Sequence, residues 1–237
     1  MTNFNIDTIK LLIEESLQEL STGDEWLDNR YIEQIDIIGH TNPYYKLFYL
    51  IGQRFKSALI VELGSWRADG AAHFASGNPE SQVVTIDIHR EDLEAQKRCY
   101  EAANHYPNLT YINKWTWDAV EDIKALNQAI SIIFIDAWHD YKYAKREWDL
   151  YYPLLADKAL VICDDITTAY NFEGMIDFWN ELPEPKFLDN RVHPGIPFGF
   201  CIVDKLPKEN ENVAENRGID TTQSTGNVRR GRPRKSA

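Results

Sequence analysis

The sequence predicts an α/β fold in which a mostly parallel sheet is covered by helices on both faces. Several short runs are apolar at consecutive positions, as expected for strands that are buried on both faces. Segments with helical periodicity separate these runs, which indicates repeated βα units. Four of the runs end on acids, namely Glu62, Asp87, Asp136 and the pair Asp164 and Asp165. Because the carboxyl ends of parallel strands share one edge, we expect these acids to line one crevice.

Two segments of helical pattern precede the sheet. Apolar residues recur at helical spacing from Ile6 to Leu20 and stop before Ser21-Thr22-Gly23. An aromatic segment from Tyr44 to Phe55 follows Asn42-Pro43 and ends just before the first strand. We therefore predict that residues 1–57 form a helical segment that packs on the core as a lid.

Alternating strands and helices fill the rest of the folded body. Strands are predicted at residues 58–63, 82–87, 109–113, 131–135, 158–163 and 198–204. After the first strand a helix is predicted up to residue 77, and further helices are predicted at 90–103, 117–129, 141–155 and 172–182. This pattern is typical of a single domain, at residues 58–206, with a Rossmann-like and mostly parallel seven-stranded sheet.

The composition predicts a soluble cytoplasmic protein that does not contact a membrane. The 237 residues carry a net charge of -12, which argues against the folded body as a general binder of nucleic acid. Cys99, Cys163 and Cys201 show no metal-type spacing, and two of them lie in apolar runs, so they are predicted to be buried, reduced thiols. No apolar stretch is long enough to span a bilayer, and the first residues lack the features of a secretory signal.

Residues 207–237 differ in composition from the folded body. They are rich in Asn, Glu, Thr, Gln, Ser and Gly and almost free of apolar residues, which predicts a disordered polar tail. Its end, Arg229 to Lys235, contains Gly-Arg-Pro and resembles an AT-hook, a short segment that binds the minor groove of A·T-rich DNA. Weak contact with DNA is one interpretation of this motif, and a solubilising or targeting tail is the other.

The loop after the first strand has the pattern of a nucleoside-binding turn. Gly64 allows a tight turn and the close approach of a ligand, and Asp87, 23 residues further on, ends the neighbouring strand. In a dinucleotide fingerprint a second glycine would stand at Trp66, whose indole would keep a pyrophosphate away from the backbone. A nucleoside ligand is therefore favoured over a dinucleotide that transfers hydride.

Three segments resemble the motifs of class I S-adenosylmethionine-dependent methyltransferases. Val61 to Ala75 is similar to their first motif, and Thr85 to His89 is similar to their second, acidic motif. Ile135 to Tyr141 resembles the I-D-G-x-H-x-Y signature of a branch that contains small-molecule and sugar O-methyltransferases and the cephalosporin-hydroxylase-like group. The resemblance covers roughly residues 45–205. The sequence departs from the usual residues of the family at Ala68, Gly70 and Ala137.

The resemblance implies that the cofactor is S-adenosylmethionine. The cofactor-binding residues that it implies are Glu62, Gly64, Ser65, Asp87, Ile88, Thr116, Trp117 and Asp136. The first loop would border the methionyl end, Asp87 would hold the ribose, and the loop from Lys114 to Trp117 would border adenine. Two alternatives stay open, because Glu62 could instead cap the following helix and Trp115 or Trp117 could be core residues.

Asp136, Asp164 and Asp165 form a predicted cation site, since they end two strands that are expected to be adjacent. Carboxylates about 4 Å apart would repel by roughly 4 kcal/mol per pair at an effective dielectric near 20, so the cluster should protonate or bind a cation. Ligands that are all oxygen favour Mg2+, Ca2+ or Mn2+. The resemblance points the same way, because metal-dependent O-methyltransferases carry acids at these strand ends, and we predict Mg2+ or another divalent cation.

His139 and Asp136 are the predicted catalytic residues. His139 lies three residues past Asp136, where catechol-type relatives place a basic residue, and an imidazole with a pKa near neutral suits the removal of a proton. The alternative is a structural histidine that bonds to the strand end or packs beside the cofactor. The candidate walls of the acceptor pocket, which could equally be core residues, are Trp66, Trp138, His193 and Phe198.

Together these patterns predict a divalent-metal-assisted O-methyltransferase that uses S-adenosylmethionine and acts on a small hydroxylated acceptor, such as a sugar or a natural product. One alternative is a nucleic-acid or nucleotide methyltransferase tethered by the basic tail, although no Asn/Asp-Pro-Pro-Tyr signature follows the fourth strand to hold a flipped base. The other alternative is a non-catalytic nucleoside-binding protein. A homo-oligomer is compatible with each of these predictions.

Overall fold

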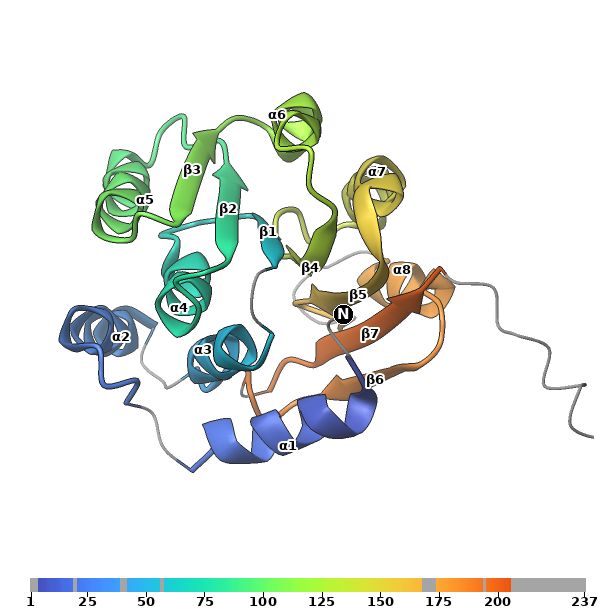
Figure 1. Ribbon diagram of the computed structural model, residues 1–237, viewed down its shortest axis with the longest axis horizontal. Coiled ribbons are helices and arrows are strands. Elements are labelled where there is room, and N and C mark those ends of the chain that lie inside the picture. The colour runs from blue at the N-terminus through green and yellow to red at the C-terminus, as the bar shows by residue number, and fades with distance from the viewer. Residues whose placement is uncertain are drawn as a thin grey trace, which may run out of the picture. The chain divides into compact units, whose positions relative to one another are not determined.

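A seven-stranded sheet forms the centre of the computed structural model (Figure 1). Its strands are β1 (Leu59–Leu63), β2 (Gln82–Asp87), β3 (Leu109–Asn113), β4 (Ile130–Ile135), β5 (Leu155–Cys163), β6 (Lys186–Asp189) and β7 (Phe198–Asp204). Their order in the sheet is β3-β2-β1-β4-β5-β7-β6. Strands β1 to β5 are parallel to one another, and β7 runs antiparallel to both β5 and β6. The prediction of an α/β fold with a mostly parallel, Rossmann-like sheet is confirmed.

The structure describes residues 4–18, 21–38, 42–55, 58–167, 174–193 and 195–205. All of them belong to one compact unit. The predicted tail at residues 207–237, with its AT-hook-like end at Arg229 to Lys235, lies outside the described residues. Its disorder and its contact with DNA therefore stay predictions, as does the division of the folded part into residues 1–57 and 58–206.

Eight α-helices lie within the described residues. They are α1 (Ile6–Ser16), α2 (Glu25–Ile38), α3 (Tyr44–Arg54), α4 (Asp69–Gly77), α5 (Leu93–His105), α6 (Val120–Ala125), α7 (Tyr141–Tyr151) and α8 (Met175–Glu181). The sequence analysis did not predict α2, because acidic and amide residues interrupt its apolar positions. Strand β6 was also not located in advance, since a four-residue edge strand is too short to show a period.

Two predicted helices end early for local reasons. The segment predicted as a helix at 117–129 is a 3-10 turn, Thr116–Asp118, followed by the short α6, and Asn127 beyond it has a left-handed φ of 51°. The helix predicted to reach residue 155 ends at Tyr151, where a 3-10 turn that contains Pro153 leads directly into β5. Proline cannot continue a helical hydrogen-bond ladder, so the strand begins three residues earlier than predicted.

Helices cover both faces of the sheet, as the alternation of strands and helices predicted. Residues from α1 to α5 pack on one face, where Phe48 and Phe74 meet Phe134 and Phe198. Residues from α6, α7 and α8 pack on the other face, for example Tyr151 and Phe178. Strands β1 and β4 contribute alternate side chains to the two cores, which explains why their sequences are apolar at all positions except Glu62 and Ser131.

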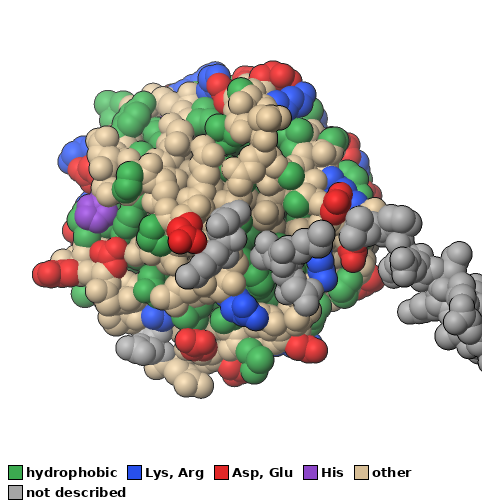
Figure 2. Space-filling model, in the orientation of Figure 1, with side chains coloured by type: hydrophobic (Ala, Val, Ile, Leu, Met, Phe, Trp, Pro, Cys, Tyr) green, Lys and Arg blue, Asp and Glu red, His purple; other side chains and the backbone are tan. Residues whose placement is uncertain are grey.

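The surface and the cysteines agree with the composition. Cys99, Cys163 and Cys201 are buried and form no disulfide. No helix in the part of the chain that the structure describes is long and apolar enough to cross a membrane. On the face drawn in Figure 2, basic and acidic side chains of the described residues are mixed around the rim, so charges of one sign do not gather there.

Candidate active site

The parallel strands bring the predicted acids to one edge of the sheet. Strand β1 pairs with β2 on one side and with β4 on the other, and β4 pairs with β5. The carboxyl ends of all four strands therefore lie together, and they carry Glu62, Asp87, Asp136 and the pair Asp164 and Asp165. The crevice expected from the sequence is present.

Gly64 allows the first loop to pass directly over the end of β4. Its φ is 96°, and its N–H donates to Ile86 O at 2.9 Å. A Cβ atom built on Gly64 would lie 2.2 Å from the carbonyl oxygen of Asp136, so only glycine fits this crossing. Further along the loop, Ala68 has a left-handed φ of 59° at one of the positions where the sequence departs from the family.

Glu62 is buried at the start of this loop. Thr85 Oγ1 donates a hydrogen bond to its carboxylate, and burial raises the pKa of Glu62 well above its ordinary value. A Cβ on Gly70 would lie 2.3 Å from Glu62 Oε1, so the glycine makes room for this carboxylate against α4. The hydrogen bond that the structure shows at the Glu62 carboxylate comes from Thr85, which belongs to β2 and not to α4.

Asp87 fastens the first loop to the end of β2. Its Oδ2 accepts hydrogen bonds from the backbone N–H groups of Ser65 and Trp66, both at 2.9 Å. Its Oδ1 accepts from the N–H of Ile88 at 2.7 Å. About a quarter of the carboxylate side chain is exposed, at 27%. Asp87 thus shapes the loop besides facing a cavity, a function that the sequence analysis did not anticipate.

That cavity lies beyond the ends of β2 and β4. It is lined by Asp87, Ile88, Trp115, Thr116, Ala137 and Trp138. Two hydrogen bonds to residues of α7 hold Thr116 in place. Its hydroxyl donates to Glu147, and its carbonyl accepts from the Tyr151 hydroxyl at 2.6 Å. Trp117 is not a lining residue: it stacks on Trp115 with ring centroids 5.0 Å apart, and the Arg146 guanidinium lies 4.4 Å from its ring.

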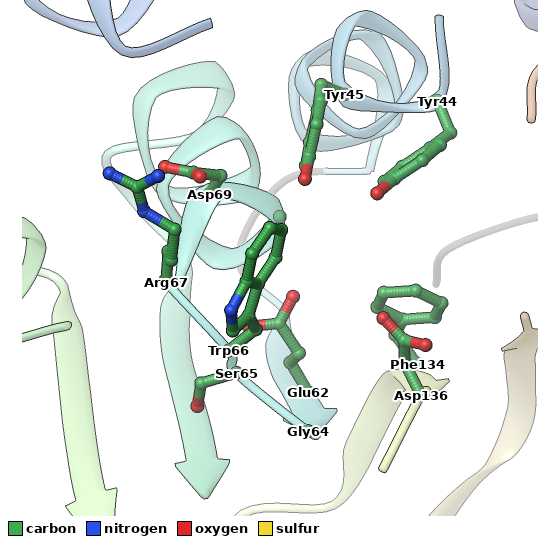
Figure 3. Close-up of a pocket in the computed structure, with 11 residues that line it drawn as sticks. Tyr44, Tyr45, Glu62, Gly64, Ser65, Trp66, Arg67, Asp69, Phe134 and Asp136 are labelled. Atoms are coloured by element: carbon green, nitrogen blue, oxygen red, sulfur yellow. The ribbon is translucent and has the colours of Figure 1, made fainter. Parts of the chain in front are cut away.

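A second cavity is lined by the first loop (Figure 3). Helix α3, the first loop and the end of β4 enclose it. Its lining residues are Tyr44, Tyr45, Glu62, Gly64, Ser65, Trp66, Arg67, Asp69, Gly70, Phe134 and Asp136. The sequence analysis did not propose Tyr44 and Tyr45 as site residues, because apolar and aromatic residues at their positions in a helix are ordinarily core residues. We name this the loop cavity, and the cavity beside Trp115 the tryptophan cavity.

Three carboxylates and two histidines meet where β4 and β5 end. His139 Nδ1 lies 2.5 Å from Asp165 Oδ2, and His139 Nε2 lies 3.2 Å from Asp136 Oδ1. His193 Nδ1 lies 3.0 Å from Asp164 Oδ1. The sequence analysis proposed His193 only as a possible pocket wall, because the residue lies 29 positions from Asp164 in the chain. We call these five residues the carboxylate–histidine cluster.

Like charges and burial set the protonation of this cluster. Burial and the neighbouring Asp164 raise the pKa of Asp136 to about 7, and burial also raises the pKa of Asp164. Burial opposes charge on His139, but the hydrogen bonds to Asp136 and Asp165 outweigh it and raise the pKa of this imidazole to about 11. The two carboxyl groups therefore favour the protonated form of His139, whereas the sequence analysis expected a pKa near neutral.

The cluster has the chemistry of a cation site. Single ligand atoms of Asp136, His139 and Asp165 lie within 4.8 Å of one another, and so do those of Asp164, Asp165 and His193. Carboxylate oxygens and imidazole nitrogens are both common ligands of divalent ions. The predicted trio does not form one such group: Asp165 belongs to both groups, whereas Asp136 and Asp164 belong to different ones, each with a histidine.

Comparison with known proteins agrees with this architecture. Residues 61–166 match the family model that describes a methyltransferase domain. No curated protein sequence matches the chain. Among solved structures, the O-methyltransferase TomG from Streptomyces achromogenes, involved in tomaymycin synthesis and bound to SAM, is 16% identical with a TM-score of 0.61, covering 85% of this chain and 100% of that chain.

Two further structures share the fold. The O-methyltransferase from Bacillus cereus in complex with SAH is 17% identical with a TM-score of 0.61, covering 84% of this chain and 100% of that chain. CalS11, a TDP-rhamnose 3'-O-methyltransferase of calicheamicin biosynthesis, is 13% identical with a TM-score of 0.52, covering 81% of this chain and 92% of that chain.

The sheet and the crevice at its carboxyl edge define a class I methyltransferase fold. The family comparison agrees with this fold, because residues 61–166, which carry most of the site, match the model of a methyltransferase domain. The resemblance to the class I S-adenosylmethionine-dependent methyltransferases, drawn from the sequence, is confirmed.

Proposed function

We propose that this protein transfers a methyl group from S-adenosylmethionine to a hydroxyl oxygen of a small acceptor, such as a sugar or a natural product, with the help of a divalent cation. One observation carries the proposal, which is that both cavities and the carboxylate–histidine cluster meet at residues 136–138, directly after β4. Asp136 lines the loop cavity, Ala137 and Trp138 line the tryptophan cavity, and the carboxylate of Asp136 belongs to the cluster.

The two cavities suit the two ends of the cofactor. The tryptophan cavity offers an aromatic wall for adenine and the exposed part of Asp87 for ribose hydroxyls. The loop cavity offers Glu62, Ser65 and the Gly64 backbone to the methionyl end. S-adenosylmethionine supplies, when bound, a methyl group on a positively charged sulfur. Asp136 lies where the two cavities approach each other, so its carboxyl group would face that sulfur.

The carboxylate–histidine cluster would hold and activate the acceptor. A divalent cation supplies, when bound, orientation of a hydroxyl group and a lower pKa for it. Asp136, Asp164 and Asp165 would be its ligands, with Mg2+ favoured by their oxygen atoms. We assign His139 as the base that removes the proton of the acceptor. Its high pKa comes from Asp136 and Asp165, so neutralising these two carboxylates would bring the pKa down toward the range of a base.

The acceptor we propose is a small molecule, and no macromolecular partner is needed for this chemistry. The test is to incubate the protein with Mg2+, S-adenosylmethionine labelled in its methyl group, and a panel of sugars, phenols and natural-product alcohols. Label on the oxygen of one small molecule supports the proposal. Label found only on protein or DNA would contradict the acceptor class, and full activity in EDTA would contradict the cation.

A further inference from the structure

We propose that Tyr44 and Tyr45, adjacent residues of α3, bind the aminoacyl end of the cofactor through their hydroxyl groups. This inference rests on the proposed function and deepens it, because it makes the segment before the sheet part of the cofactor site. The sequence predicted only a lid there. Under this proposal α3 supplies binding groups as well as cover.

Tyr44 and Tyr45 both line the loop cavity. Figure 3 shows both rings extending from α3, with their hydroxyl ends directed toward the side where Glu62, Phe134 and Asp136 lie. Phenolic oxygens thus face carboxylic oxygens across the cavity. The aminoacyl end of the cofactor is a free amino acid that carries an ammonium and a carboxylate on the same carbon, and a cavity with acids on one wall and hydroxyl groups on the other can bind both.

Packing fixes the direction of both rings. Tyr45 stacks on His73 of α4, with centroids 5.1 Å apart and planes at 22°. Tyr44 stacks on Phe198 of β7, with centroids 5.1 Å apart and planes at 23°. The two hydroxyl groups are hydrogen-bonded to each other, and the residues are only 7% and 4% exposed. Binding groups that are held in place before the ligand arrives lose little conformational entropy on binding.

Both tyrosines keep their protons at neutral pH. Burial, and then the acids around them, raises the pKa of Tyr44 and of Tyr45 well above the ordinary value. A neutral phenol adds no negative charge to a cavity that already contains Glu62 and Asp136. It therefore tolerates the carboxylate of an aminoacyl group, which another acidic side chain would repel.

The positions of the two tyrosines allow them to contact the aminoacyl end of the cofactor and not its adenosine. Neither tyrosine lines the tryptophan cavity, which contains Asp87 and Trp115. Gly64 of the first loop packs on Asp136 and Ala137, which line the loop cavity and the tryptophan cavity respectively. Groups on α3 therefore reach a ligand only at its loop-cavity end.

The experiment compares two ligands by titration calorimetry on the full chain. S-adenosylhomocysteine has the aminoacyl end, whereas 5′-methylthioadenosine has the same adenosine and sulfur without it. The variants are Tyr44→Phe and Tyr45→Phe, which keep the stacked rings. Tyr31→Phe is the matched control, because Tyr31 is buried beside Tyr45, at 5.9 Å between centroids, and lines neither cavity.

We expect Tyr45→Phe and Tyr44→Phe each to raise the Kd for S-adenosylhomocysteine about fivefold, the usual effect of one lost hydrogen bond. The Kd for 5′-methylthioadenosine should stay within about twofold in every variant, and Tyr31→Phe should change neither. Unchanged binding of S-adenosylhomocysteine, or equal losses for both ligands, would overturn this inference while leaving the proposed function intact. Failure of the unaltered protein to bind S-adenosylhomocysteine would overturn both.

Discussion

Replacement of Gly64 by alanine should harm this protein far more than a glycine-to-alanine change in an open loop. The Cβ atom would lie 2.2 Å from the carbonyl oxygen of Asp136 and 2.7 Å from the Cα of Ala137. Ordinary contact begins at 3.4 Å, so the loop and the end of β4 would have to separate by about 1.2 Å. Both sides of this contact are backbone, and no side chain can move aside.

The expected loss of stability has three sources. Alanine at positive φ costs about 1 kcal/mol relative to glycine. The separation would break the 2.8 Å hydrogen bond from Asp136 N–H to Leu63 O, at about 1 kcal/mol. Residual overpacking adds about 1–3 kcal/mol. We therefore expect Gly64→Ala to lower the free energy of unfolding by about 3–5 kcal/mol.

Urea unfolding gives the loss of stability for Gly64→Ala and for Gly23→Ala, and the difference between the two losses measures the steric part alone. Gly23 also has a positive φ, of 79°, but a Cβ there would meet nothing within 4 Å. Gly23→Ala should therefore lower the free energy of unfolding only by the conformational cost, about 1 kcal/mol. Equal losses for the two variants would refute the reasoning, because they would show that the crossing over β4 tolerates a methyl group.

Three other results are expected. Asp87→Ala removes the acceptor of the Ser65 and Trp66 N–H groups, so calorimetry should show at least about tenfold weaker binding of S-adenosylhomocysteine. Asp87→Asn keeps one side-chain oxygen and should lose less affinity for S-adenosylhomocysteine than Asp87→Ala. If both variants bound it as tightly as the unaltered protein, the role of Asp87 would be contradicted. Burial raises the pKa of Glu147 from 4.5 to about 7, so the folded protein resists its ionisation and stability should fall as pH rises from about 4.5 to 7. Glu147→Gln should flatten this fall in Tm, and an unchanged pH profile would argue against the raised pKa. Asp165→Ala should weaken Mn2+ binding in spectroscopic titration while sparing S-adenosylhomocysteine, and undiminished Mn2+ affinity would exclude Asp165 as a ligand.

The sequence could predict the crevice because its cause is local. Strands buried on both faces are apolar at every position, and the first polar residue after each run marks its carboxyl end. Parallel pairing then places Glu62, Asp87 and Asp136 together without further information. The positions of these acids follow from pattern and topology alone.

Other parts of the site depend on contacts that no local pattern contains. Tyr44 and Tyr45 have the spacing of core residues, and only the packing of α3 over the first loop shows that they line a cavity. His193 reaches Asp164 because the chain returns beside β5 as the antiparallel strand β7. The protonation of His139 depends on the carboxyl groups of Asp136 and Asp165. Asp165 has a left-handed φ of 57°, which no sequence pattern predicted. These are tertiary effects, and sequence periodicity carries no record of them.

A crystal structure of the full chain with S-adenosylhomocysteine and Mn2+ would test the central claim most directly. We predict density for adenosine between Asp87 and Trp115, for the aminoacyl group beside Tyr45, and for the ion among Asp136, Asp164 and Asp165. A ligand bound elsewhere on the molecule, with these cavities filled only by solvent, would contradict the account.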